Sequence, residues 1–375
     1  MSKYRRQITG AVVVTVLMAG LASSAQPGAK TLEIGEKAPD FRLPGVDGRM
    51  YRLEDFAETD VLVIAFTCNH CPTAQAYEGR IKRIAADYKN KGVALVAISP
   101  NDPKAVRLDE LGYSDMGDSF DDMRIRAKDM EYNFPYLYDG EDQKVSAAYG
   151  PARTPHVFIF DKQRTLRYEG GIDDAEKPEL VNSRDARNAI EELLKGRKVS
   201  VERTRTIGCS IKWSDKRESA RQSLAMWAQE GVDVEMIDAK GVRELAKNDS
   251  GKLRVINVWA SWSGPSTEQL AEFVTANRMY RRREFEMITI SADSPSRKST
   301  VLSLLKKQQA SCRNFLFDSQ DQYQLMSALD KDLLGGVPYT LLIKPGGEVI
   351  YRRLGTIDPL ELKKAIVGYL GRYYK

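Results

Sequence analysis

Cysteine and histidine are both scarce in this chain, which has four cysteines and two histidines among 375 residues. So few cysteines exclude a small fold held by many disulfides, and two histidines leave little scope for a His-rich metal site. A strong charge of one sign is also missing, since 57 basic side chains face 52 acidic ones. Nucleic-acid-binding proteins show a marked basic excess, so we expect no nucleic-acid partner. Any chemistry that uses cysteine must therefore be confined to a local site.

Long apolar runs are missing everywhere except at the N-terminus, where Ile8–Leu21 follows three basic residues and precedes small residues ending at Ala25. This pattern is typical of a secretory signal peptide over residues 1–25, cut after Ala25. An uncleaved anchor is the alternative, but the run is shorter than the roughly 20 residues that a membrane span needs. We expect an exported mature chain, periplasmic or secreted, without an integral membrane span.

Strands and helices alternate through the first half of the mature chain. Apolar and β-branched runs predict strands, and helical spacing of apolar residues predicts helices. The predicted strands are 61–66, 93–98, 136–138, 156–160 and 166–169, and the predicted helices lie near 81–88, 120–130 and 183–194. This alternation indicates βαβ units and a largely parallel sheet.

The second half repeats this plan, which indicates two copies of one α/β fold. Its predicted strands are 255–259, 287–290, 339–343 and 349–352, and its predicted helices are 301–306 and 359–370. We expect a first domain over 31–200 with a tail to 213, a connector over 214–235 that is helical at 217–228, and a second domain over 236–375. The basic cluster Arg281–Arg283 is interpreted as a solvated helix end.

Two cysteines, Cys68 and Cys71, form a Cys-x-x-Cys between a predicted buried strand and a helix. A helix N-terminus favours an anion, so we expect Cys68 to be largely thiolate and to act as the nucleophile. The spacing places Cys71 one turn along on the same face, where it can resolve a mixed disulfide. The redox-active Cys68–Cys71 disulfide would need no further cofactor. Zinc is disfavoured, because an isolated pair gives too few ligands.

His70 lies between these cysteines. A cation beside a thiolate lowers the pKa of the thiol and makes the disulfide more oxidising. The Asn-His dipeptide between the two cysteines therefore predicts a less reducing site than a Gly-Pro dipeptide would give. The alternative for His70 is an exposed loop residue.

Thr154 and Pro155 come directly before the strand 156–160. With this pair the sequence resembles the thioredoxin superfamily, in which a cis-proline loop packs against the Cys-x-x-Cys. Residues 31–213 are similar to its peroxiredoxin-like (redoxin, AhpC/TSA-like) branch through Ala38–Phe41, Phe66–Pro72, Thr154–Phe158 and Gly208–Trp213. The resemblance implies a central mixed sheet flanked by helices. It also implies thiol-disulfide oxidoreductase or antioxidant activity on protein thiols or disulfides.

His156 follows Pro155, so both histidines fall on the two loops expected to meet at the site. Proton transfer with the Cys71 thiol is one hypothesis for His156. A side chain that faces away at the strand start is the other.

The second half carries Ser263 and Ser266 where periplasmic TlpA-like thioredoxin domains, which residues 259–266 resemble, have cysteines. Serine cannot form a disulfide but is a good helix N-cap, so this copy should fold and be redox-inactive. Val337 and Pro338 supply the matching proline loop. The degenerate copy either binds substrate or partner segments or is purely structural. Serine hydrolysis is disfavoured, because neither histidine lies in this half.

Cys209 and Cys312 remain. Cys209 lies in the tail that the resemblance includes, so it is an accessory thiol that could exchange disulfides with Cys68 or Cys71, or simply a partly buried thiol. Cys312 has no evident partner, and a Cys209–Cys312 bond stays open.

These features predict an exported thiol-disulfide oxidoreductase acting on protein substrates with an unidentified redox partner. A thiol peroxidase is the first alternative, since Cys71-Pro72-Thr73 matches a peroxidatic Cys-Pro-Thr pattern. Against it, Thr67 stands four residues before Cys71, whereas peroxidases place a threonine three before the reactive cysteine. A non-enzymatic binding or assembly factor is the second alternative.

Overall fold

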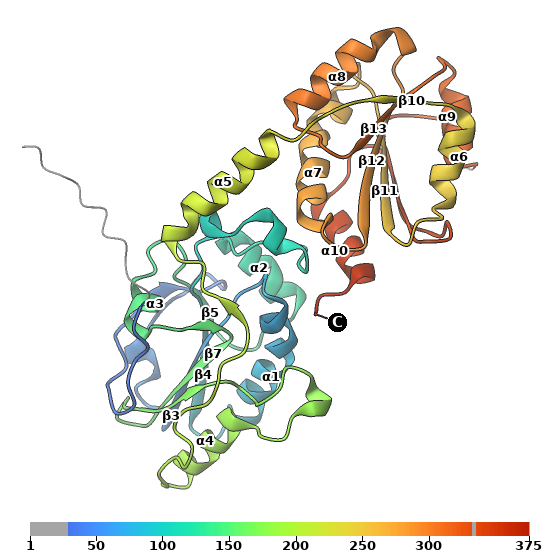
Figure 1. Ribbon diagram of the computed structural model, residues 1–375. Helices are drawn as coiled ribbons and strands as arrows, with labels where there is room; N and C mark the ends of the chain where they lie inside the picture. The colour runs from blue at the N-terminus through green and yellow to red at the C-terminus, as the bar shows by residue number, and fades with distance from the viewer. Residues whose placement is uncertain (1–28, 332–334, 375) are drawn as a thin grey trace, which may run out of the picture.

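The computed structural model describes residues 29–331 and 335–374, and it forms two α/β units joined by a long connector (Figure 1). The predicted signal peptide, residues 1–25, lies outside the described residues. Within the described residues, no helix combines the length and the apolar character that a membrane crossing requires.

The first unit is built on a five-stranded sheet in the order β5-β4-β3-β7-β8. Its strands are β3 (Val61–Phe66), β4 (Val93–Ser99), β5 (Tyr136–Tyr138), β7 (His156–Phe160) and β8 (Leu166–Gly170). Its helices are α1 (Pro72–Tyr88), α2 (Phe120–Asp129), α3 (Lys144–Tyr149) and α4 (Asp185–Leu194). Two small sheets flank this core, β1 (Arg42–Pro44) with β2 (Met50–Arg52), and β6 (Arg153–Thr154) with β9 (Cys209–Ser210).

The second unit repeats this order in a six-stranded sheet, β10-β13-β12-β11-β14-β15. Its strands are β10 (Glu235–Ile237), β11 (Leu253–Trp259), β12 (Phe285–Ser291), β13 (Arg313–Phe317), β14 (Tyr339–Ile343) and β15 (Val349–Leu354). Its helices are α6 (Ala239–Lys247), α7 (Gly264–Tyr280), α8 (Lys298–Lys307), α9 (Gln322–Leu329) and α10 (Pro359–Leu370). The helix α5 (Arg217–Ala228) lies in the connector with the bounds that the sequence predicted.

Each sheet is mixed, which gives both units the expected thioredoxin-like fold. The central strand β3 pairs in parallel with β4 but antiparallel with β7, and β11 does the same with β12 and β14. The βαβ pattern had suggested a largely parallel sheet. That expectation is wrong for the last two strands of each unit, because a short turn joins them into an antiparallel hairpin.

Burial on both faces explains why the central strands have continuous apolar sequences. Alternate residues of β3 enter two different hydrophobic clusters, Val63 on the side of α1 and Ile64 on the opposite side of the sheet. Every residue of β3 is buried, as in a strand covered on both faces. This rigid strand delivers the loop at Cys68 to a fixed position.

The two units are in contact through the end of α7 and the segment 108–119 of the first unit. Tyr280 Oη donates to the Ser114 carbonyl at 2.8 Å. The Arg283 guanidinium donates to the Gly112 carbonyl at 2.9 Å and lies 4.0 Å from the centre of the Tyr113 ring. The interpretation of Arg281–Arg283 as a solvated helix end is therefore wrong, because this cluster supplies part of the contact between the units.

Candidate functional site

The loop between β3 and α1 places two sulfurs at the start of a helix. Cys68 follows β3 by two residues, and Cys71 is the N-cap of α1, with Pro72 at its first position. The Ala74 amide donates to the Cys71 sulfur at 3.5 Å, which is a helix-terminus contact that favours a thiolate. Both cysteines are buried, 2% and 0% exposed.

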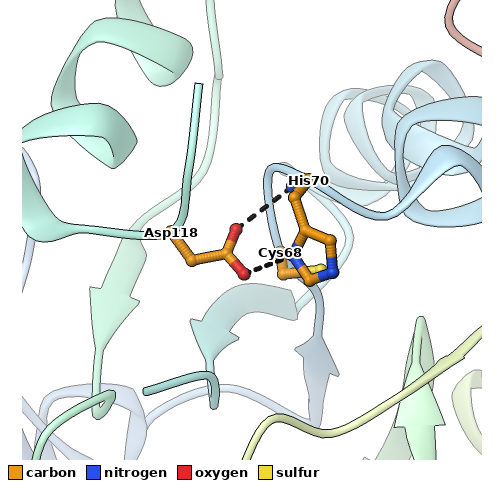
Figure 2. A group of neighbouring side chains, drawn as sticks. All are labelled: Cys68, His70 and Asp118. Atoms are coloured by element: carbon orange, nitrogen blue, oxygen red, sulfur yellow. Dashed lines mark hydrogen bonds and ion pairs between the residues drawn. The ribbon is translucent and has the colours of Figure 1, made fainter. Parts of the chain in front are cut away.

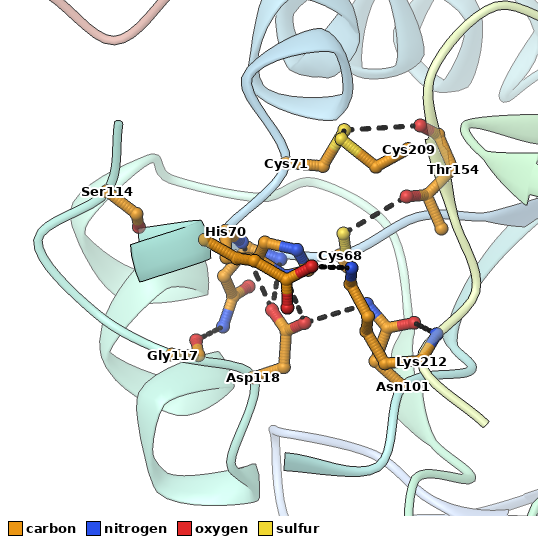
Figure 3. A network of polar contacts seen from close by, with 12 residues as sticks. Cys68, His70, Cys71, Asn101, Ser114, Gly117, Asp118, Thr154, Cys209 and Lys212 are labelled. Atoms are coloured by element: carbon orange, nitrogen blue, oxygen red, sulfur yellow. Dashed lines mark hydrogen bonds and ion pairs between the residues drawn. The ribbon is translucent and has the colours of Figure 1, made fainter. Parts of the chain in front are cut away.

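The proline loop packs against both sulfurs through one residue. Thr154 Oγ1 lies 3.2 Å from the Cys68 sulfur, and the Thr154 carbonyl oxygen lies 3.4 Å from the Cys71 sulfur (Figure 3). The Thr154–Pro155 peptide bond is cis. The backbone at Thr154 thus spans the pair of cysteines.

A buried ion pair between His70 and Asp118 stands beside the sulfurs (Figure 2). His70 Nδ1 and Asp118 Oδ2 are 2.5 Å apart, with exposures of 2% and 0%. Burial alone would lower the pKa of His70, but the charge and hydrogen bond of Asp118 outweigh it and raise that pKa. Burial conversely raises the pKa of Asp118, and the charge and hydrogen bond of His70 lower it overall. The contact with Asp118 thus favours the imidazolium form of His70, and because His70 is 2% exposed it is not an exposed loop residue.

Asp118 also fixes the backbone of the Cys-x-x-Cys loop. Its Oδ1 accepts from the Asn69 and His70 amides at 2.9 and 3.1 Å, and Asn101 Nδ2 donates to its Oδ2 at 2.7 Å. Sequence reasoning missed Asp118, which lies in an irregular segment 48 residues away from His70. No spacing or periodicity in that segment could have indicated it.

The surroundings of the two thiols act on their pKa values in opposite directions. Burial would raise the pKa of Cys71, but hydrogen bonds with Cys209 and Cys68 and the charge of His70 bring it well below its usual value. Burial, the hydrogen bond to Cys71 and the charge of Asp118 raise the pKa of Cys68. The helix N-cap position and these donors favour a thiolate at Cys71, whereas the sequence placed it at Cys68.

Cys209 is the third sulfur of the site. Its sulfur lies 2.7 Å from that of Cys71, and Cys209 pairs with Thr154 where β9 meets β6. Cys312 lies elsewhere, in the second unit, where its thiol donates to Asn314 at 3.4 Å. The structure thus contradicts a Cys209–Cys312 bond, and both residues are free thiols.

The ring nitrogens of His156 are hydrogen-bonded to groups other than the cysteines. Its Nδ1 accepts from the Ala152 amide at 3.1 Å, and its Nε2 lies 2.8 Å from Glu169 Oε2. Its ring also packs on Phe158, with centroids 4.4 Å apart. The hypothesis of proton transfer with Cys71 fails, because both ring nitrogens are bonded to other groups.

Three possible metal-ligating atoms meet at the site. One atom each from Cys68, His70 and Asp118 lie within 4.8 Å of one another, and all three residues are buried. The sequence suggested too few ligands for a metal, because it did not reveal Asp118. In this arrangement the His70 imidazole and the Asp118 carboxylate are hydrogen-bonded to each other.

The strand register of the second unit places Ser263 where the first unit has Cys71 and Ser266 one turn along, where the first unit has Ala74. Ser263 is the N-cap of α7, and the Val337–Pro338 peptide bond is cis. Serine therefore stands at the N-cap of an intact helix, as expected, although the Ser263 side chain makes no capping hydrogen bond. Ser266 is fully buried and its hydroxyl has no hydrogen-bond partner.

The C-terminal segment of the second unit reaches the site of the first. Arg372 donates to both carboxylate oxygens of Asp115 at 2.7 and 2.8 Å, and Asp115 is 2% exposed. The Tyr374 ring packs on Tyr113 at 4.9 Å, and burial together with the nearby Cys209 raises the pKa of the Tyr374 hydroxyl. The unit that lacks the Cys-x-x-Cys pair therefore contributes side chains around the sulfurs.

Comparisons with known proteins agree with this architecture. Residues 34–169 and 228–352, more than half of the chain, match the model of the AhpC/TSA family. The thiol-disulfide oxidoreductase ResA of Geobacillus thermodenitrificans is 26% identical over 173 residues, covering 44% of this chain and 88% of the relative.

Two solved structures are also similar to part of the chain. An uncharacterized conserved protein from Geobacillus kaustophilus is 39% identical, with a TM-score of 0.44, over 50% of this chain and 95% of the other. A hypothetical protein from Sinorhizobium meliloti 1021 is 35% identical, with a TM-score of 0.44, over 50% and 97% of the two chains.

Proposed function

The chain belongs to the AhpC/TSA family, and from that premise we propose that it is an exported thiol-disulfide oxidoreductase whose Cys68 and Cys71 cycle between dithiol and disulfide on protein substrates. One observation carries the proposal. The Cys71 sulfur lies at a helix N-terminus, next to Cys68, beside a buried imidazolium and against the cis-proline loop. An oxidoreductase also fits the relatives that are named thiol-disulfide oxidoreductases.

In the reducing direction, the Cys71 thiolate attacks one sulfur of a substrate disulfide. A bond forms between Cys71 and that sulfur, and the other substrate sulfur leaves with the electron pair and takes a proton. Cys68 then loses its proton and attacks Cys71, which releases the second substrate thiol and leaves the Cys68–Cys71 disulfide. The His70 cation stabilises the thiolate at the start of each cycle and favours a centre that is less reducing than one with Gly-Pro between the cysteines.

Substrate access requires a rearrangement, because Cys68 and Cys71 are 2% and 0% exposed. The residues that lie over them belong to the tail at Cys209 and to the C-terminal segment at Tyr374. Both are peripheral segments and not strands of the central sheet, so a substrate can displace them without opening the core.

We propose that the second unit is redox-inactive and supports the site by holding the segment 108–119. Arg372 holds this segment at Asp115, and three residues later the segment supplies Asp118 to His70. Asp115 also lies 3.9 Å from Arg126, which pairs with Glu78 of α1 at 2.7 Å. Binding of substrate or partner segments by this unit is a second role, and Trp262, 54% exposed next to Ser263, is the side chain most available for it.

A thiol peroxidase is the second candidate, favoured by the lowered pKa of Cys71 and by Pro72 directly after it. In that reaction the Cys71 thiolate would attack a peroxide oxygen, become a sulfenic acid and then condense with a neighbouring thiol. Peroxide consumption that survives Cys68→Ser but not Cys71→Ser would support this activity.

The experiment that tests the proposal follows three reactions of the reduced protein in parallel: insulin reduction, oxidative refolding of a reduced substrate and peroxide consumption. We expect the first two to depend on Cys68 and Cys71. Peroxide turnover alone would favour the peroxidase, and inactivity in all three would favour a binding or assembly factor. Cell fractionation and N-terminal sequencing test export, with Gln26 expected as the first mature residue.

A further inference from the structure

We propose that the redox centre has three working sulfurs, with Cys71 exchanging its disulfide partner between Cys68 and Cys209. This deepens the proposed function and rests on it. The geometry points to Cys209 because its sulfur lies 2.7 Å from that of Cys71, which is also in contact with Cys68 (Figure 3). Cys71 is thus the shared member of two pairs.

The backbone builds Cys209 into this position. The strand β9 pairs antiparallel with β6, and Cys209 lies opposite Thr154, whose carbonyl contacts the Cys71 sulfur. Gly208 permits this approach, because a Cβ at that position would lie 2.0 Å from the Thr154 carbonyl oxygen. Its φ of 144° is also one that glycine accommodates most readily.

The tail that carries Cys209 is fixed to the same network as the Cys-x-x-Cys loop. The Lys212 amide donates to Asn101 Oδ1 at 2.9 Å, and Asn101 Nδ2 donates to Asp118 at 2.7 Å. Gln143 also donates to the Lys212 carbonyl at 2.9 Å. The placement of Cys209 is therefore held by buried polar contacts on both sides.

The exchange step needs no external oxidant or reductant. Starting from the Cys68–Cys71 disulfide, Cys209 loses its proton and its sulfur attacks the sulfur of Cys71. The Cys71–Cys209 bond forms, the Cys68–Cys71 bond breaks, and the leaving Cys68 sulfur keeps the electron pair and takes a proton. The three sulfurs together hold the same number of electrons before and after.

This step would move the disulfide towards solvent. Cys209 is half-buried, whereas Cys68 and Cys71 are 2% and 0% exposed. A substrate thiol can then attack the Cys209 sulfur, which sends electrons to Cys71. Tyr374, which packs on Tyr113, lies near Cys209, so the second unit's C-terminal segment is close to the outer sulfur of the relay.

Disulfide mapping by mass spectrometry tests this inference on the full mature chain. The protein is reduced, oxidised with one equivalent of diamide, quenched with acid, alkylated and digested. In the Cys68→Ser variant we expect an intramolecular Cys71–Cys209 disulfide in most molecules. The double variant Cys68→Ser, Cys312→Ser is the control, and it should form this disulfide in the same yield. Two free thiols at these positions, or intermolecular bonds only, would overturn the proposal.

Two further variants separate this inference from the proposed function. Cys209→Ser should still form the Cys68–Cys71 disulfide and reduce insulin, while losing at least half of its oxidation rate towards a reduced protein substrate. Gly208→Ala should lower the yield of the Cys71–Cys209 disulfide by at least fivefold in the Cys68→Ser background. An unchanged oxidation rate in Cys209→Ser contradicts the relay alone, whereas absence of the Cys68–Cys71 disulfide from the wild type contradicts the proposed function.

Discussion

His70 Nδ1 lies 2.5 Å from Asp118 Oδ2, and this buried pair places a positive charge beside the two sulfurs of the Cys-x-x-Cys loop. A cation in a low-dielectric setting acts strongly on a neighbouring thiolate, because solvent does little to screen it. The pair therefore links the irregular segment 108–119 to the acidity of Cys71.

Replacing Asp118 with asparagine should raise the pKa of Cys71, because His70 loses the carboxylate that keeps it protonated. A rise of about one unit would lower the thiolate fraction at pH values below the pKa about tenfold. The pH profile of iodoacetamide alkylation measures this, in a Cys209→Ser, Cys312→Ser background that leaves the Cys68–Cys71 pair. Asp121→Asn, at an exposed position in the first turn of α2, is the matched control and should leave the profile unchanged.

The same pair makes the free energy of unfolding depend on pH. The pKa of His70 is raised, so its contribution is fully present below the ordinary value of 6.5 and is lost as pH rises through the folded pKa. The pKa of Asp118 is lowered, so its contribution is present above 3.8 and is lost as pH falls through the folded pKa. Urea unfolding from pH 2 to 9 should show both trends in the wild type. Identical pH dependence in Asp118→Asn would refute this account of the pair.

His156→Ala should leave the alkylation profile of Cys71 unchanged, because both nitrogens of His156 are bonded away from the sulfurs. It should instead reduce stability by about 1–3 kcal/mol, the usual cost of leaving a buried polar partner unpaired. His70→Ala is the contrasting variant and should shift the profile upward. A shifted profile in His156→Ala, measured between pH 5 and 8, would restore the proton-transfer hypothesis.

Arg372→Ala should loosen the segment 108–119, because Asp115 loses its bidentate partner. We expect a loss of about 1–3 kcal/mol in the free energy of unfolding, as for hydrogen bonds to charged groups. If the second unit positions Asp118, the alkylation profile of Cys71 must also shift upward. Arg372→Lys should keep only part of the stability and part of the wild-type alkylation profile, because a lysine ammonium cannot make the bidentate contact with Asp115.

The exposed Arg243 provides the control for this comparison, since Arg243→Ala removes a positive charge from α6 without touching the site. Loss of stability in Arg372→Ala with no change in the Cys71 profile would leave the second unit a purely structural role.

Restoring sulfur to the second unit should restore its redox chemistry. Ser263 is the N-cap of α7 as Cys71 is of α1, Ser266 lies three residues further into the helix, and the Ser266 hydroxyl is buried without a partner. A thiol there is less polar, so Ser263→Cys with Ser266→Cys should fold normally. In a Cys68→Ser, Cys71→Ser background, peptide mapping should find the new disulfide, with measurable insulin reduction. A folded protein with two free thiols after diamide treatment would count against the match between the two sites.

The parts of the fold that the sequence predicted are those with strong local patterns. The apolar run 61–66 became β3 with the same bounds, and the repeat of strand, helix and proline loop became two units with the same strand order. The edge strand β10 was missed because it has three residues, of which Met236 is 41% exposed. Short, half-exposed strands carry little periodicity.

Site residues were predictable where one local motif contains them and unpredictable where the tertiary fold brings them together. Cys68, Cys71 and Thr154 followed from motifs, whereas Asp118 reaches the site through an irregular segment. The sequence placed the thiolate at Cys68, whereas the hydrogen-bond donors of the folded site converge on Cys71, and which sulfur receives them is set by the tertiary fold.

The central claim is that Cys68 and Cys71 exchange disulfides with a protein substrate, and the rate of insulin reduction by dithiothreitol measures it most directly. The account predicts that the wild type accelerates this reaction, that Cys71→Ser abolishes the acceleration, and that Cys312→Ser, which changes a thiol outside the site, keeps it. A wild-type rate no faster than dithiothreitol alone, or full activity in Cys71→Ser, would contradict the account.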